Sequence, residues 1–271
     1  MNLQVQPWTT VVDVETLAAA LAGAGHIVLL DARAALGDPD AGARMYAQGH
    51  LPGARHVDLE RDLSDHGVDH DRSGEGRHPL PRSDAFAAKA GAWGIAPGVQ
   101  VVVYDAAEGS MAAARAWWLL RLLGHREVAV LDGGLRAWTE AGHAVETAST
   151  FPVPLPPYPG RFDRSQWVDA SEVQARLGDA PGWLLDARAV ERFRGEVEPI
   201  DPVAGHVPGA VSSPFAANVM DGRLRPPAEM RARLEPLLAG NAPADVVLMC
   251  GSGVTACHLL LALEVAGLGG A

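Results

Sequence analysis

Residues 246–264 read VVLMCGSGVTACHLLLALE, and this stretch decides how the second half of the chain folds. The apolar run from Val246 to Met249 predicts a buried strand, and the apolar pattern after the glycine-containing loop predicts a helix. Cys250 therefore falls between a strand and a helix N-terminus, where the helix macrodipole and the N–H groups of the loop favour a thiolate. Gly251 and Gly253 allow the loop to turn those N–H groups toward one point. We interpret Cys250 as a nucleophile rather than as a cysteine that only packs.

The same order of motifs occurs twice in the chain. Each copy begins with an amphipathic helical pattern behind a candidate capping aspartate, Asp13 or Asp169. The matched segments are 12–21 with 168–177, LLDAR at 29–33 and 184–188, GHLPGA at 49–54 with GHVPGA at 205–210, and 101–105 with 246–250. Because strands alternate with helices in each copy, the sequence predicts two α/β domains, each with a mainly parallel sheet flanked by helices.

The expected domain boundaries follow from these copies. We expect an N-terminal domain at 8–145, a proline-rich linker at 146–164 and a C-terminal domain at 165–271. The first copy continues into the segment VAVLDGGLRAW at 128–138, which predicts a further strand and helix. The second copy has no counterpart of this segment, so we expect its sheet to lack the last strand and helix. A strand edge and apolar surface would then be left uncovered.

Composition narrows the classes of partner. The chain has 271 residues, a net charge of −11 and two cysteines, Cys250 and Cys257. The net charge and the absence of a basic run argue against nucleic acid. Two cysteines do not make a disulfide framework, and no leader pattern or membrane-spanning apolar run is evident. We therefore expect a cytoplasmic protein with no membrane partner, no metal site and no cofactor.

Together these motifs resemble a tandem rhodanese-type sulfurtransferase over nearly the whole chain. The loop from Cys250 to Thr255 is the most specific element of this resemblance. In that family the cysteine accepts a sulfane sulfur from a small anionic donor and carries it as a persulfide. The sulfur then passes to cyanide or to a thiol acceptor, of which a thioredoxin-like protein is one option. The resemblance implies that the loop N–H groups stabilise the anionic sulfur, and the loop residues concerned are Gly251, Ser252, Gly253, Val254 and Thr255.

The resemblance also identifies residues that would bind the donor. Arg192 matches the arginine that binds the anionic donor, because a guanidinium forms paired hydrogen bonds with a carboxylate or sulfonate. His78 and Ser252 match members of a proton-transfer set in the mercaptopyruvate-using branch. The expected third member is Asp58 or Glu60.

The donor itself stays open between thiosulfate and 3-mercaptopyruvate. Gly251 and Ser252 resemble the mercaptopyruvate-using branch, since the thiosulfate-using branch usually carries basic residues at those two positions. That first branch also has a second arginine nine residues after the one matched by Arg192, and this chain has Asp201 there. An aspartate at that place would repel a carboxylate.

Several other residues are expected to be structural. Asp186 and Arg188 would hold the end of a strand, and His206 would bond to the backbone of its turn. Cys257 would be a small buried side chain, while Arg194 fits either a structural or a binding role. Asp105 occupies the place of Cys250 in the first copy and cannot act as a sulfur nucleophile, so we expect only the C-terminal copy to be catalytic.

Two alternatives come from other classes of protein. A cysteine phosphatase also uses a strand–loop–helix cysteine, but it needs an arginine six residues later, where this chain has Ala256. The second alternative is a persulfide carrier or interaction module without small-molecule turnover. The intact loop argues against an inert scaffold and leaves the carrier open. Donor-dependent turnover separates an enzyme from a carrier.

Overall fold

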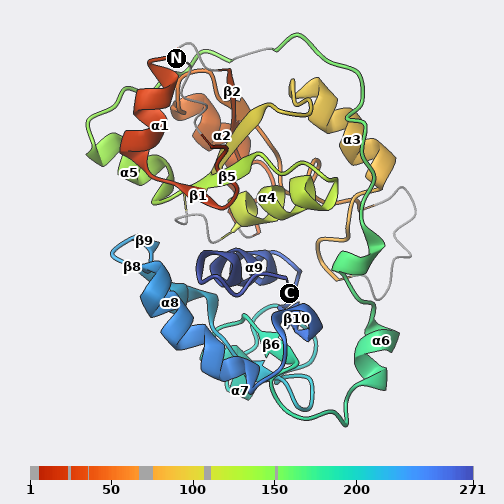
Figure 1. Cartoon of the computed structure of the whole chain (residues 1–271). Coiled ribbons are helices and arrows are strands. Elements are labelled where there is room, and N and C mark those ends of the chain that lie inside the picture. The colour runs from red at the N-terminus through yellow and green to blue at the C-terminus, as the bar shows by residue number, and fades with distance from the viewer. Residues whose placement is uncertain are drawn as a thin grey trace. The chain divides into compact units, whose positions relative to one another are not determined.

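The computed structural model of the chain describes residues 6–23, 26–35, 37–66, 76–106, 111–149 and 152–270. Within these residues the chain forms two compact units (Figure 1). Unit 1 comprises Met1–Asp65 with Leu80–Asp163, and unit 2 comprises His66–Pro79 with Arg164–Ala271. The segment around His78 therefore packs with the second unit, although it lies inside the first copy of the sequence.

Unit 1 is built on a five-stranded parallel sheet in the order β1-β5-β4-β2-β3. Asp13 caps the first helix as predicted, because its Oδ1 accepts the Thr16 N–H at 2.7 Å. The elements are β1 (Val11–Val12), α1 (Val14–Leu21), β2 (Ile27–Asp31), α2 (Ala41–Gln48), β3 (Arg55–His56), α3 (Ser83–Ala92), β4 (Gln100–Tyr104), α4 (Ala112–Leu122), β5 (Val128–Leu131) and α5 (Gly134–Glu140).

The core of unit 1 lies between its sheet and its helices. Helices α1 and α5 share one apolar cluster with alternate residues of β2, β4 and β5, so they cover the same face of the sheet. Helix α4 packs against β4 and β5. Strand β4 is buried over four of its five residues, which is typical of a central parallel strand covered on both faces.

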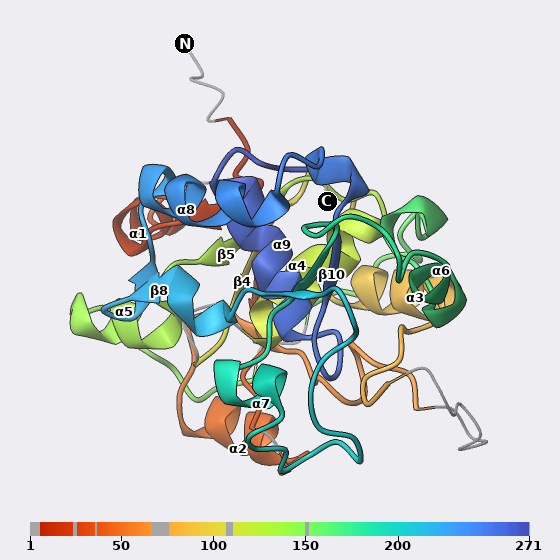
Figure 2. The ribbon, with the colours of Figure 1, turned by 90° about the horizontal axis from the view of Figure 1, so that it is seen from below.

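Unit 2 repeats the central part of this architecture with a three-stranded parallel sheet in the order β10-β6-β7. Its helices α8 and α9 contribute to one apolar cluster together with β6, and α9 lies beside β10 (Figures 1 and 2). The helices and strands are α6 (Ala170–Ala175), β6 (Leu184–Asp186), α7 (Val190–Arg194), β7 (Val211–Ser212), β8 (Val219–Met220), β9 (Arg223–Leu224), α8 (Pro227–Leu234), β10 (Val247–Met249) and α9 (Thr255–Val265). Short 3-10 turns lie at Arg164–Gln166, Phe215–Asn218, Glu235–Leu238 and Pro243–Asp245.

The narrower second sheet was predicted, and its consequences are visible in the matched elements. In unit 1, β1 pairs with β5, and among the described residues of unit 2 no strand corresponds to either. Val168, the counterpart of Val12, is 38% exposed, whereas Val12 is 4% exposed. Helix α6 buries none of its residues, although Asp169 and Glu172 form a complete capping box at its start. The second unit thus keeps the strands that carry the site and leaves more apolar surface exposed.

The proline-rich stretch, which was expected to be a spacer, packs along unit 1. The Leu155 N–H donates to Gly91 O and the Tyr158 N–H to Ala87 O, both at 2.9 Å. A Cβ on Gly91 would lie 2.2 Å from Pro156 O, so a glycine in α3 permits this close approach. Prolines keep this segment extended, but its contacts with α3 decide where it lies.

None of the helices in the described part of the chain is long and apolar enough to cross a membrane.

Candidate functional site

Cys250 lies where the sequence predicted it, after β10 and before α9. Its Sγ accepts the Gly253 N–H at 3.0 Å and the Ser252 N–H at 3.5 Å. Two of the loop N–H groups expected to face the sulfur therefore do so. The side chain is partly buried and carries a free thiol. A sulfur held between two N–H donors near a helix N-terminus is well placed to carry negative charge.

The two glycines of this loop serve different purposes. Gly253 has a φ of 74°, which is a left-handed backbone conformation that favours glycine. Gly251 leaves space for the charged side chains beside it, because a Cβ there would lie 2.8 Å from Asp201 Oδ2 and 2.9 Å from Arg77 Nη2. It would also lie 3.3 Å from Arg192 Nη2. Three charged side chains thus converge on the residue next to Cys250.

A cavity of about 330 Å³ opens beside Cys250 at the carboxyl end of the sheet of unit 2. This is the edge of a parallel sheet at which ligands usually bind in α/β folds. Its size is suited to a small molecule. The residues that line it are Arg188, Asp201, Val203, Ala204, Gly205, His206, Val207, Met249, Cys250 and Gly251.

The repeated AspAlaArg and GlyHis motifs form one frame behind this cavity. Asp186 holds the Arg188 guanidinium through both carboxylate oxygens, and Arg188 Nη2 donates to Gly205 O at 2.7 Å. In unit 1, Arg33 is held by Asp31 and donates to Gly49 O at the same distance. The structural role predicted for Asp186 and Arg188 is therefore confirmed. The Asp186 carboxylate also raises the pKa of the Arg188 guanidinium, which stays charged.

His206 was expected to bond to the backbone of its turn, and it does. Its Nδ1 lies 2.7 Å from Phe193 O, and its ring stacks on Phe193. Cys257 is buried, as predicted, and its Sγ donates to Gly253 O at 3.1 Å. The side chain of Arg194 is 64% exposed and lies 3.8 Å from Glu196, so this arginine belongs to the surface of the unit.

Arg192 is engaged by two carboxylates from the acidic loop that follows α7. Glu198 accepts from its Nε and Nη2 at 2.8–3.1 Å, and Asp201 accepts from Nη2 at 2.7 Å. Glu198 also accepts the Asp201 N–H at 2.9 Å, which folds the loop back toward the arginine. The Asp201 N–H, the Arg192 guanidinium and the Ile200 N–H together lower the pKa of Glu198 to about 2. Glu198 is therefore an anion at neutral pH, and it fixes the Arg192 side chain.

Arg77 is a member of this cluster that the sequence did not reveal. Its guanidinium forms an ion pair with Asp201, and its side chain is 31% exposed. Asp201 thus lies between Arg77 and Arg192, beside Gly251. The only available signal was the position of Arg77 directly before His78. The two partners of this ion pair are 124 residues apart in the sequence.

His78 belongs to the same unit as Cys250 and is buried, and its ring lies 6.4 Å from that of His66. The role of His78 and Ser252 in a shared proton-transfer set remains a prediction. Asp58 and Glu60, the expected third members, belong to unit 1. The Asp58 carboxylate there accepts the Glu60 N–H at 2.8 Å and holds Arg61 at 2.9 Å, so it stabilises its own turn.

In unit 1, a carboxylate replaces the sulfur at the end of the equivalent strand. Asp105 is buried, and its Oδ2 accepts the N–H groups of Met111 and Ala113 at 3.2 and 3.1 Å. It therefore satisfies N–H groups at the start of α4, as Cys250 does before α9.

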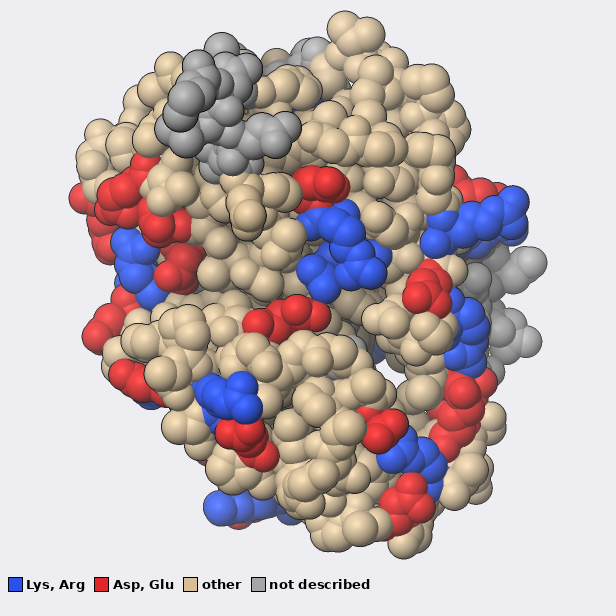
Figure 3. All heavy atoms as spheres, viewed as in Figure 1, with Lys and Arg blue, Asp and Glu red and all other residues tan. Residues whose placement is uncertain are grey.

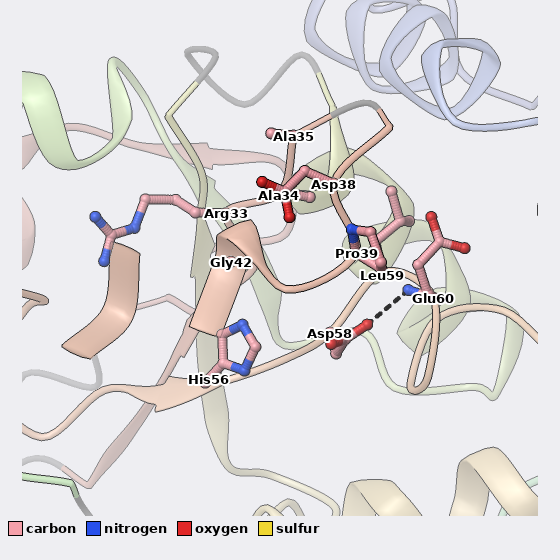
Figure 4. Close-up of a pocket in the computed structure, with 10 residues that line it drawn as sticks. All are labelled: Arg33, Ala34, Ala35, Asp38, Pro39, Gly42, His56, Asp58, Leu59 and Glu60. Carbon is pink, nitrogen blue, oxygen red and sulfur yellow. Dashed lines mark hydrogen bonds between the residues drawn. The ribbon is translucent and has the colours of Figure 1, made fainter. Parts of the chain in front are cut away.

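The cavity shown in Figure 4 lies at the carboxyl end of the unit 1 sheet, and its volume is about 10 Å³. This is room for about one water molecule. In Figure 4 the guanidinium of Arg33 points away from the other lining residues, consistent with its bonds to Asp31 and Gly49. A small-molecule substrate would not fit in this cavity.

The described residues contain no group of three or more His, Cys, Asp or Glu side chains arranged to hold a metal ion. On the face drawn in Figure 3, acidic and basic side chains lie interspersed. Such a surface offers no continuous positive field to a polyanion.

Comparison with known proteins gives a consistent result. Residues 13–141 match the rhodanese-like domain. A Pseudomonas aeruginosa protein named probable 3-mercaptopyruvate sulfurtransferase is 50% identical over 243 residues, which cover 89% of this chain and 84% of that protein. A Mycobacterium tuberculosis protein named putative thiosulfate sulfurtransferase SseB is 40% identical over 254 residues, covering 93% of this chain and 86% of that one. The crystal structure of the 3-mercaptopyruvate sulfotransferase SseA from Escherichia coli aligns with a TM-score of 0.78 at 32% identity, covering 96% of this chain and 95% of that one.

Proposed function

This chain belongs to the rhodanese-type sulfurtransferase family, and from this premise we propose that it moves a sulfane sulfur from thiosulfate or 3-mercaptopyruvate to cyanide or a thiol through a persulfide on Cys250. The observation that carries the proposal is the position of Cys250. Its sulfur accepts two backbone N–H groups and borders a cavity of about 330 Å³. The same N–H groups would hold the thiolate before transfer and the persulfide anion after it.

The proposed reaction has two steps. The Cys250 thiolate attacks the sulfane sulfur of thiosulfate, the S–S bond of the donor breaks, and sulfite leaves with the electron pair. With 3-mercaptopyruvate a C–S bond breaks instead, and the resulting enolate takes up a proton to give pyruvate. The acceptor then attacks the outer sulfur of the persulfide, and Cys250 leaves as a thiolate.

Residues around Cys250 have proposed roles in donor binding. Arg192 binds the anionic group of the donor, because a guanidinium that Glu198 holds in place is prepared for paired hydrogen bonds. His78 helps to bind the donor, and with Ser252 it transfers the proton that the mercaptopyruvate reaction requires. Unit 1 has no sulfur nucleophile at Asp105, and we assign it no chemical step.

The test is direct detection of the persulfide. After incubation with either donor, the wild-type protein should gain the mass of one sulfur atom on the peptide that contains Cys250, and cyanide or a dithiol should remove it. Cys250→Ser should abolish both the mass gain and turnover. A mass gain on Cys257 instead would disprove the assignment of the nucleophile, and a stable persulfide without turnover would indicate a carrier.

Arg192 is tested by steady-state kinetics with both donors. Arg192→Ala should raise the donor KM, because removing a charge-assisted hydrogen bond from a partly desolvated site costs about 1.5–3 kcal/mol. Arg192→Lys should restore donor binding only in part, since an ammonium lacks the planar geometry of the guanidinium. An unchanged KM for both donors would remove Arg192 from the binding site.

A further inference from the structure

The charged cluster beside Gly251 contains two arginines that share one carboxylate. Asp201 accepts from Arg192 Nη2 at 2.7 Å and forms an ion pair with Arg77. All three side chains reach the place where a Cβ of Gly251 would stand. Since Gly251 directly follows Cys250, this carboxylate binds two cations one residue from the reactive sulfur.

The two carboxylates on Arg192 differ in their accessibility. The Glu198 side chain is 5% exposed, and it accepts the backbone N–H groups of Ile200 and Asp201. The Asp201 side chain is 23% exposed and lines the cavity beside Cys250. Glu198 is therefore fixed in the loop, whereas Asp201 can leave the arginines by turning toward solvent. Partly exposed ion pairs contribute little to stability, so this movement costs little.

We propose that Asp201 is a built-in competitor of the donor, and that the donor's anionic group replaces it on a pair of arginines formed by Arg192 and Arg77. Arg77 is then a second donor-binding residue, and Asp201 determines how tightly anionic donors bind. The charge balance supports this exchange. Without a donor, the charges of Arg77 and Arg192 are matched by those of Asp201 and Glu198, and the anionic group of a donor takes the place of the Asp201 charge when that side chain moves away.

This proposal rests on the proposed function, because it assumes that Arg192 binds the donor. It also explains how the chain can bind an anionic donor although it has Asp201 where the mercaptopyruvate-using branch has a second arginine. Asp201 would repel an anionic donor only if it stayed in place. When it moves aside, it leaves behind two guanidinium groups, one of them from the distant segment around His78.

The first test compares two carboxylates on the same arginine. Asp201→Asn should lower the KM for thiosulfate and for 3-mercaptopyruvate by about 2- to 5-fold, as expected for a partly exposed competing ion pair. The kcat should change less than about 2-fold, because the sulfur and its N–H donors are untouched. Glu198→Gln should raise KM, because Arg192 loses the group that fixes it. If Asp201→Asn also raises KM, Asp201 is structural and the proposal is wrong.

A matched control separates exchange from a general charge effect. Glu196→Gln removes the same charge from the same loop at a side chain that is 56% exposed. It should change KM by less than about 2-fold, since exposed charges at a distance are screened. A decrease as large as that caused by Asp201→Asn would refute the exchange.

Arg77 is tested in two backgrounds. Arg77→Gln should raise the donor KM several-fold in the wild-type protein and again in the Asp201→Asn protein. If it has no effect once Asp201 is replaced, Arg77 only neutralises Asp201 and does not bind the donor. Should Asp201→Asn fail to fold, as judged by thermal unfolding, Asp201→Ala serves in the same comparisons.

Equilibrium binding distinguishes failure of this proposal from failure of the proposed function. In a Cys250→Ser background, calorimetry should show tighter binding of thiosulfate after Asp201→Asn and weaker binding after Arg77→Gln. These binding changes would support the exchange even if no persulfide formed in the wild-type protein. A persulfide on Cys250 with thiosulfate binding unchanged in both variants would overturn the exchange and leave the proposed function standing.

Discussion

Replacing Gly251 by alanine is expected to disturb donor binding with little cost in stability. The new Cβ would lie 2.8 Å from Asp201 Oδ2 and 2.9 Å from Arg77 Nη2, where ordinary contact begins at 3.4 Å. Both neighbours are the ends of flexible side chains, 23% and 31% exposed, so they can retreat by about 0.5 Å. The change therefore displaces the charged cluster and leaves the backbone alone.

The energetic balance of this substitution can be worked out from the structure. Weakening the partly exposed ion pairs of Asp201 costs about 0–1 kcal/mol. Replacing a glycine that does not need a left-handed backbone stabilises by about 0.4–1 kcal/mol, because the unfolded chain loses freedom. We expect the free energy of unfolding of Gly251→Ala to stay within about 1 kcal/mol of wild type.

Gly253→Ala is the matched comparison in the same loop. Its φ of 74° costs an L-residue about 1–2 kcal/mol. Its N–H is the closer donor to Cys250 Sγ, so distortion there should lower kcat. Urea unfolding and donor kinetics of both variants are the assay. Gly251→Ala should mainly raise KM, while Gly253→Ala should mainly lower stability and kcat. A larger stability loss for Gly251→Ala than for Gly253→Ala would refute this division of roles.

Three further predictions concern residues around the two sheets. Cys257→Ser should keep most of the sulfur-transfer activity, because a serine hydroxyl can also donate to Gly253 O; an activity assay in which this variant is dead would contradict that role. Asp105→Ala should lower the free energy of unfolding by about 1–2 kcal/mol, since the N–H groups at the start of α4 lose their acceptor. The same variant should keep kcat within a few-fold of wild type. A large loss of kcat in a folded protein would show that unit 1 takes part in the chemistry. The pKa of Glu198 is lowered from its usual 4.5 to about 2, so its stabilising effect is present above pH 4.5 and lost as the pH falls toward 2. The difference in unfolding free energy between wild type and Glu198→Gln should therefore shrink over that range, and a constant difference would mean that the carboxylate charge on Arg192 is unimportant.

The framework of each unit could be predicted from the sequence because it depends on local contacts and on motifs that occur twice. Asp13 and Asp169 cap helices within three residues of themselves. The strand–loop–helix around Cys250 follows from one continuous stretch of 19 residues. The narrower second sheet could be expected because residues 165–271 contain no second copy of the segment at 128–138.

What could not be predicted depends on contacts between distant parts of the chain. The proline-rich composition indicates an extended segment, but Gly91 in α3 decides that it packs along unit 1. Arg77 meets Asp201 across 124 residues of sequence, and no local pattern connects them. Glu198 lies in an acidic stretch that could be read equally well as a solvated surface loop. Only its bonds to Arg192 and to the backbone of its own loop show that Glu198 holds the arginine in position.

These distant contacts change how the loop after Cys250 should be interpreted. Basic residues at positions 251 and 252 are typical of the thiosulfate-using branch, and their absence here favours the other branch if the loop is considered alone. In this chain, however, any side chain at position 251 would occupy the space taken by Arg77, Arg192 and Asp201. Positive charge beside the sulfur thus comes from two other segments, and both arginines form ion pairs with Asp201. The affinity for anionic donors should therefore depend on the exchange at Asp201 as well as on the loop sequence. An arginine introduced at position 251 alone would displace the existing cluster before it could add a binding group.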